Sequence, residues 1–188
     1  MIESDPSDDE LSQLMTALGA ATFQAQSLEY QVVTLFATCK LMDDKVERGS
    51  DTIRKLMDTR YKQTLGRLIR DAASELRLNP QLADQLEVAL QDRNWLIHNF
   101  YRDFGPVAVS RPLYRAAMER LLSVRSILEE TVEAVYEVIV RRFSETGLDE
   151  KELATRALHS TSQYVKEYFE PPATYVEIGE IVSLGSLG

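Results

Sequence analysis

The sequence predicts an all-α protein, an antiparallel up-and-down helical bundle of four to five main helices with a short extended C-terminal tail. Apolar residues recur at three-four spacing over long stretches, which is typical of the buried stripe of an amphipathic helix. The 188 residues include only eight glycines and six prolines, which favours long helices over a fold with many strands and turns. A chain of this length makes one compact domain with room for an appendage.

The first helix is expected from about Asp9 to the charged run at 43–48, after an acidic start over residues 1–8 that we expect to be disordered. A short helix should follow over about 50–59, since Ser50 or Asp51 can cap it. Another is expected over about 62–78. Its inward-facing residues are predicted to be Leu65, Leu68, Ile69, Ala72, Ala73 and Leu76.

The later helices have clear start signals. Asn79-Pro80 places a capping residue before a proline at the first helical position, and the helix it opens should run to about Tyr101. Ser110-Arg111-Pro112 similarly opens a long helix to about Phe143. The bundle therefore occupies residues 9–145. Residues 146–188 are expected to form an additional helix, over about 149–169, and an extended tail that covers the bundle or completes a dimer.

Charge and cysteine content limit the function. The net charge of −9 argues against generic nucleic-acid binding. Residues 48–125 nevertheless hold fourteen bases and nine acids, which fits either a local phosphate site or a solvated mix of helix faces. Cys39 is the only cysteine, so no disulfide forms within the chain, and a reducing compartment is expected. With no apparent signal peptide and no apolar run of roughly 18 residues, we expect a soluble cytoplasmic protein and no membrane partner.

The segment 92–101 carries the clearest chemical signal. It contains Arg93, Asn94 and His98, a guanidinium that matches phosphate geometry, an amide, and a side chain that titrates near neutral pH. Asn94 and His98 are four residues apart and therefore neighbours on a helix. Arg93 and His98 are about 140° apart and do not share a face. Arg93 falls near the middle of the apolar arc of this helix, so it needs an ionic partner, for which Glu29 is the best candidate. The residues of that arc are Leu82, Leu86, Ala89, Leu90, Leu96, Ile97 and Phe100.

Simpler interpretations of these residues stay open. Arg93 can be a structural ion-pair residue, His98 a surface histidine and Asn94 incidental. The flanking aromatic residues are more often packing residues than base-stacking ones. No glycine-rich phosphate loop is present, and His159 is expected on a helix surface. A set of glutamates at helical spacing lacks a histidine and is interpreted as a solvated face, so no metal and no cofactor is expected: Glu129, Glu130, Glu133 and Glu137.

The pattern Arg93-Asn94-x-x-x-His98, late in a helix that follows earlier helical segments, resembles the HEPN superfamily. The resemblance in helical architecture covers roughly residues 10–145. Only about ten residues, those around the motif, match the superfamily specifically. It implies a metal-independent endoribonuclease that acts as a homodimer with both motifs at the interface, often as a toxin or phage-defence effector. His98 would be the general base or acid, Arg93 would stabilise the transferring phosphate, and Asn94 would orient His98 or bind a phosphate oxygen. Cleaved RNA would carry a 2′,3′-cyclic phosphate.

Some members of that superfamily pair with a nucleotidyltransferase antitoxin that modifies a tyrosine two residues after the histidine. Here that position is Phe100, and the tyrosine comes one residue later, at Tyr101. Tyr101 and Arg102 are therefore candidate substrate-binding or regulatory residues, and a cognate antitoxin is a candidate partner beside RNA and a second copy of the chain. The alternative hypothesis is a non-catalytic helical dimerisation or regulatory module that binds a protein partner or a nucleotide.

Overall fold

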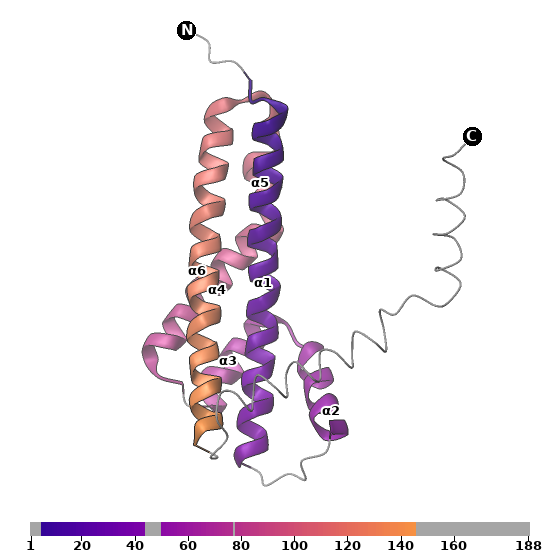
Figure 1. Cartoon of the computed structure of the whole chain (residues 1–188), viewed down its shortest axis with the longest axis vertical. Helices are drawn as coiled ribbons and strands as arrows, with labels where there is room; N and C mark the ends of the chain where they lie inside the picture. The colour runs from indigo at the N-terminus through magenta and orange to yellow at the C-terminus, as the bar shows by residue number, and fades with distance from the viewer. Residues whose placement is uncertain (1–4, 44–49, 77, 146–188) are drawn as a thin grey trace, which may run out of the picture. The chain divides into compact units, whose positions relative to one another are not determined.

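The computed structural model describes residues 5–43, 50–76 and 78–145, and every element in these ranges is helical, which confirms the predicted fold class. The chain divides into two units, Met1–Thr146 and Gly147–Gly188, and the second lies outside the described residues, as do the helix and tail predicted there. The elements are, in order, α1 (Asp8–Asp43), α2 (Ser50–Tyr61), α3 (Leu65–Glu75), α4 (Pro80–His98), α5 (Phe100–Phe104), the short 3-10 helix η1 (Gly105–Val109) and α6 (Arg111–Ser144) (Figure 1).

The two longest helices, α1 and α6, run side by side and parallel to each other (Figure 1). At their N-terminal ends, Arg111 holds Glu10 through a bidentate pair, with Nη1–Oε1 at 2.6 Å and Nη2–Oε2 at 2.9 Å. Glu10 also closes a capping box, since the Ser7 backbone N–H donates to its carboxylate at 2.8 Å. That backbone bond, and then Arg111, lower the pKa of Glu10. The pair therefore fixes where the two helices start relative to each other.

The direction of α4 makes the bundle up-and-down. Its first turn lies with Val138, near the end of α6, and its later residue Asp92 contacts Arg120, closer to the start of α6. Thus α1, α4 and α6 alternate in direction along the chain, and α4 lies behind the α1–α6 pair in Figure 1. The C-terminal half of α4, which carries the Arg93 motif, is thereby held against both long helices.

α2 and α3 pack against α1 in the lower part of the bundle as drawn in Figure 1. Arg60, on the last turn of α2, places its guanidinium 4.0 Å from the ring centroid of the fully buried Phe36. The same guanidinium bonds Asp71 at 3.2 Å and Glu75 at 3.1 Å, both on α3. One arginine thus joins α1, α2 and α3.

Several boundaries differ from the sequence expectation for identifiable reasons. The third helix begins at Leu65 because Thr64 caps it, its side chain accepting from the Arg67 backbone N–H. The fourth helix ends at His98, three residues earlier than expected, and Phe100 opens α5 after a break at Asn99. Residues 5–7 precede α1, and the carbonyl oxygen of Asp5 accepts from Arg111 at 3.1 Å.

The core follows the predicted apolar stripes. The largest fully buried side chains come from α1, α3, α4 and α6: Phe36, Leu14, Leu28, Leu35, Leu68, Leu86, Leu121, Leu128, Val32, Val33, Val124 and Val135. Their burial from four helices makes a single core for this unit. Among the residues searched, no helix is both long enough and apolar enough to span a bilayer.

Candidate functional site

The motif is carried by the last two turns of α4, and local sequence explains both ends of that helix. At the start, the Asn79 side chain accepts from the Leu82 backbone N–H at 2.7 Å, and Pro80 occupies the first helical position. At the end, Asn99 is distorted from ideal helical geometry, with φ −119° and ψ −17°, while its N–H still donates to the Trp95 carbonyl. His98 is therefore the last residue of α4, at the place where the chain turns.

Arg93 pairs with the predicted partner. Its Nη2 lies 3.9 Å from Oε2 of Glu29 on α1, and its Nη1 donates to Oδ1 of the adjacent Asn94 at 3.3 Å. The side chain is only 26% exposed. The ion pair is long, and a guanidinium carries five N–H donors, so Arg93 retains donors for a further acceptor such as a phosphate.

Glu29 also acts electrostatically on α2. Tyr61, at the end of α2, has its pKa raised to about 12, first by burial and then by Tyr30 and Glu29. The ion pair with Glu29 means that Arg93 is positioned by α1 as well as by α4.

His98 is exposed, and within the described ranges no hydrogen bond or ion pair engages its side chain. Its predicted neighbour Asn94 is instead turned to Arg93. No contact in this part of the chain joins Arg93 and His98, as expected from their separation around the helix. One chain thus presents the cation and the histidine at the same end of α4 but on different faces of the helix.

The aromatic residues divide into packing and surface groups. Trp95 meets Phe100 at 5.9 Å and Phe104 at 6.1 Å between ring centroids, in edge-to-face geometry. Phe100 is buried, so these rings pack α5 against α4, as the simpler interpretation held. Tyr101 is different, because it is 71% exposed and touches this cluster only through the Phe100 ring. Of the flanking aromatic side chains, Tyr101 is the one open to a ligand.

Asp103 ties α5 back to α4. Trp95 Nε1 donates to Asp103 Oδ2 at 2.9 Å, and Arg102 Nε donates to Asp103 Oδ1 at 3.0 Å. The Trp95 bond first, and then the bond and charge of Arg102, lower the pKa of Asp103. Arg102, a predicted substrate-binding residue, is thus engaged within its own chain while staying exposed.

Acid is expected to break this link and to change the fluorescence of Trp95, the only tryptophan. Because the pKa of Asp103 is depressed in the fold, its stabilising effect is present at neutral pH and is lost as pH falls through the folded pKa. The fluorescence midpoint should lie below the usual range for aspartate, and Asp103→Asn should remove the transition. A transition that Asp103→Asn leaves unchanged would assign the signal to another group; far-UV circular dichroism would show whether the helices persist.

A second carboxylate, Asp92, was not singled out by sequence and is the most buried charged group near the motif, at 6% exposed. Arg120 on α6 bonds its Oδ1 at 2.5 Å, and the same guanidinium lies 4.9 Å from the Trp95 ring centroid. Oδ2 of Asp92 is buried with no hydrogen-bond partner among the described residues. Helical spacing could have predicted that Asp92 is buried, because it lies only about 40° around the helix from the core residue Leu96.

Among the described residues, no group of three or more His, Cys, Asp or Glu side chains is arranged to hold a metal ion. The four glutamates of α6 are all exposed, as expected of a solvated face. Ile97, which the predicted apolar arc placed inside, is instead substantially exposed beside His98. His159 lies outside the described residues.

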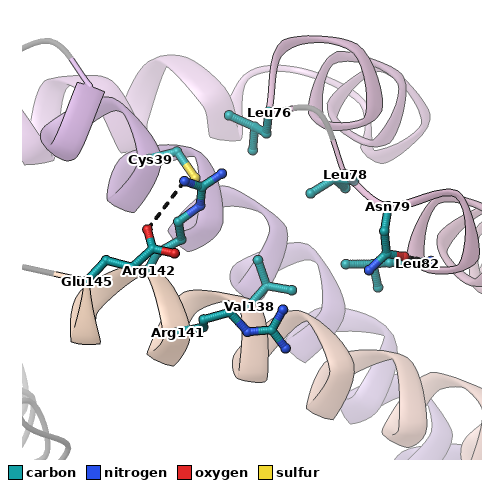
Figure 2. A pocket seen from close by; sticks show the side chains of 9 residues that line it. All are labelled: Cys39, Leu76, Leu78, Asn79, Leu82, Val138, Arg141, Arg142 and Glu145. Atoms are coloured by element: carbon teal, nitrogen blue, oxygen red, sulfur yellow. Dashed lines mark hydrogen bonds and ion pairs between the residues drawn. The ribbon is translucent and has the colours of Figure 1, made fainter.

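A pocket of about 270 Å³ lies at the opposite end of α4 from His98 (Figure 2). Leucines from α3, α4 and their connection face Val138 across it, and Arg142 pairs with Glu145 at its edge, 3.5 Å apart. The lining residues are Cys39, Leu76, Leu78, Asn79, Leu82, Val138, Arg141, Arg142 and Glu145. None of them belongs to the motif, so the candidate site is the exposed end of α4 and not this pocket.

Comparison with models of known families, with curated proteins and with solved structures finds no match to the chain. The interpretation of the motif therefore depends on its own residues and their geometry.

Proposed function

We propose that this protein is a metal-independent endoribonuclease of the HEPN type, in which His98 and Arg93 are the catalytic residues and two copies of the chain complete the site. The observation that carries the proposal is the end of α4, which carries an exposed histidine without a partner in the described fold and, on a different face, a half-buried arginine with unused donors. These two groups suit proton transfer and phosphate stabilisation, the two requirements of RNA cleavage without a metal.

In this mechanism the 2′-hydroxyl attacks the adjacent phosphorus and the 5′-oxygen leaves. His98 of one copy removes the 2′-hydroxyl proton, and His98 of the other donates a proton to the leaving oxygen. Arg93 stabilises the charge that develops on the phosphate. The absence of an Arg93–His98 contact within one described chain supports a composite site, because a second copy can bring its own Arg93 or His98 to the same phosphate. Asn94, already bonded to Arg93, fixes the orientation of the guanidinium.

A toxin or phage-defence role, with a cognate antitoxin, is the biological setting that the resemblance implies. Phe100 is buried and has no hydroxyl, so it offers nothing to a modifying partner. The exposed Tyr101 beside it offers a hydroxyl near His98. An antitoxin that modified Tyr101 would add bulk at the mouth of the proposed site and block RNA.

The test is cleavage of single-stranded and structured RNA by the purified protein in excess EDTA. We expect cleavage that survives EDTA, products with 2′,3′-cyclic phosphate and 5′-hydroxyl ends, and no cleavage of the same sequences made with 2′-deoxyribose. The His98→Ala variant is the negative control. Cleavage that requires a divalent ion, or products with 3′-hydroxyl ends, would contradict the mechanism.

The second candidate function is the non-catalytic dimerisation or regulatory module. It is favoured by the engagement of Arg93 with Glu29 and Asn94 in a folded single chain, which is what a structural arginine does. Its distinguishing result is a stable protein that binds RNA or a nucleotide, with an affinity that falls when Arg93 is replaced, and shows no cleavage of either RNA class.

A further inference from the structure

The outward face of α1 carries no charged side chain between residues 11 and 39, the part of the helix between its acidic first turn and Lys40. Residues 11–39 contain a single charged side chain, Glu29, and that carboxylate is turned to Arg93. We define the α1 face as Met15, Gly19, Phe23, Gln26 and Tyr30, which recur every three or four residues and are all exposed. Phe23, at its centre, is 65% exposed.

The outer side of α6 shows that this composition is a property of α1 and not of the bundle. Its exposed side chains are dominated by charge: Arg115, Glu119, Arg125, Glu129, Glu130, Glu133 and Glu137. A solvent-facing helix normally carries such a charged side, whereas a helix that is uncharged all round is normally buried. Large exposed apolar side chains grouped on one face mark an interaction surface.

We propose that the α1 face is the docking surface for a second copy of this chain. Two chains of net charge −9 repel each other, and the cost of their approach is least where both surfaces carry no charge. RNA would need cations on this face, and the face has none. Two uncharged, apolar faces can pair with each other across a two-fold axis without like-charge contacts.

Gly19 helps two helices to approach closely. It lies near the middle of the α1 face, and a Cβ built on it would meet no atom of its own chain within 4 Å. The backbone is therefore open to a partner at this point. A helix crossing here can place an apolar side chain, such as the partner's Phe23 or Met15, against the Gly19 backbone.

The extent of the surface predicts a weak dimer. From Ser12 to Thr34, α1 is roughly 33 Å long, and at a helix width of about 10–12 Å this gives on the order of 400 Å² per copy. Ile97 extends the surface, because it follows Arg93 by one turn and so lies on the side of α4 toward α1. The total buried area of about 1,000 Å² belongs to the small, concentration-dependent class of interface.

The position of the surface links it to the candidate site, since His98 directly follows Ile97 in the chain. A second copy docked on the α1 face would bring the two His98 side chains to the border of the interface. This link to catalysis rests on the proposed function, but the docking itself rests on the surface alone. The experiment therefore measures association and not cleavage.

The test is sedimentation velocity of the full chain over roughly 1–100 μM, the range expected for a small interface. The wild-type protein should pass from monomer to dimer with concentration. Phe23→Glu should raise the dissociation constant more than tenfold, because it places two carboxylates against each other. Leu122→Glu is the matched control: Leu122 is similarly exposed, at 52%, but lies on α6, so its substitution should leave association unchanged.

Far-UV circular dichroism of both variants should match the wild type, because neither side chain is buried. A chain that stays monomeric throughout the series, or a dimer that Leu122→Glu disrupts and Phe23→Glu does not, would overturn the proposal. An active monomer would refute both the docking and the composite two-copy site, and would leave only the nuclease activity itself. An inactive dimer that Phe23→Glu dissociates would confirm the docking and refute the nuclease.

Discussion

Replacing His98 with alanine is expected to lower the rate of RNA cleavage by about 10²–10⁴-fold, the usual contribution of a positioned general acid or base. Stability should change by no more than about 0.5 kcal/mol, because the side chain is exposed and the described fold gives it no bond to lose. Single-turnover cleavage in EDTA checks the expected fall in rate, and thermal unfolding checks the expected stability. Gln91→Ala is the matched control, since Gln91 is exposed on the same helix and has no proposed role.

Arg93 needs a comparison of variants, since it has both an ion pair and a proposed catalytic role. Arg93→Ala should lower the cleavage rate by about 10²–10³-fold, as loss of a transition-state donor does. Glu29→Gln removes the ion pair and leaves the guanidinium, so it should cost little activity. Equal losses in both variants would contradict the catalytic role and assign Arg93 to the packing of α4 on α1. Activity near wild type in His98→Ala would contradict the mechanism as a whole.

Much of the fold was predictable because the signals are local. Asn79-Pro80 and Ser110-Arg111-Pro112 mark helix starts by chemistry that acts within one turn, and α4 and α6 begin where they indicate. The three-four spacing of apolar residues likewise gave the core of α1 and α6. The break after His98 was missed, because the sequence around Asn99 contains neither glycine nor proline and the helical pattern continues into α5.

The part of the site that the sequence predicted is the ion pair of Arg93, because a charge in an apolar arc must be neutralised. Arg93 in an apolar arc required an acidic partner, and Glu29 was the single charged residue in the apolar part of α1. The pair therefore followed from the free-energy cost of burying an unpaired charge. Asp92 and Arg120 were missed because their pairing depends on the crossing of α4 and α6. Ile97 was misplaced because an ideal wheel gives the direction of a side chain but not where the neighbouring helix ends.

The largest stability effect near the site is expected from Arg120→Met. This substitution keeps an unbranched side chain over Trp95 but leaves the buried Asp92 carboxylate without a counter-ion. Removing one partner of a buried ion pair typically costs 3–5 kcal/mol. Because Arg120 is partly exposed and water can reach the site from its side, we expect about 3 kcal/mol, measured by urea unfolding followed by circular dichroism.

The double variant Asp92→Leu/Arg120→Met tests whether the cost comes from the orphaned charge. With both charged groups gone, the unpartnered Oδ2 of Asp92 is gone as well, so stability should return to within about 1 kcal/mol of the wild type. If the double variant is instead as unstable as Arg120→Met alone, the loss comes from packing around Trp95. Recovery of stability together with unchanged RNA cleavage would show that the Asp92–Arg120 pair specifies how α4 lies on α6 without taking part in the chemistry at its end.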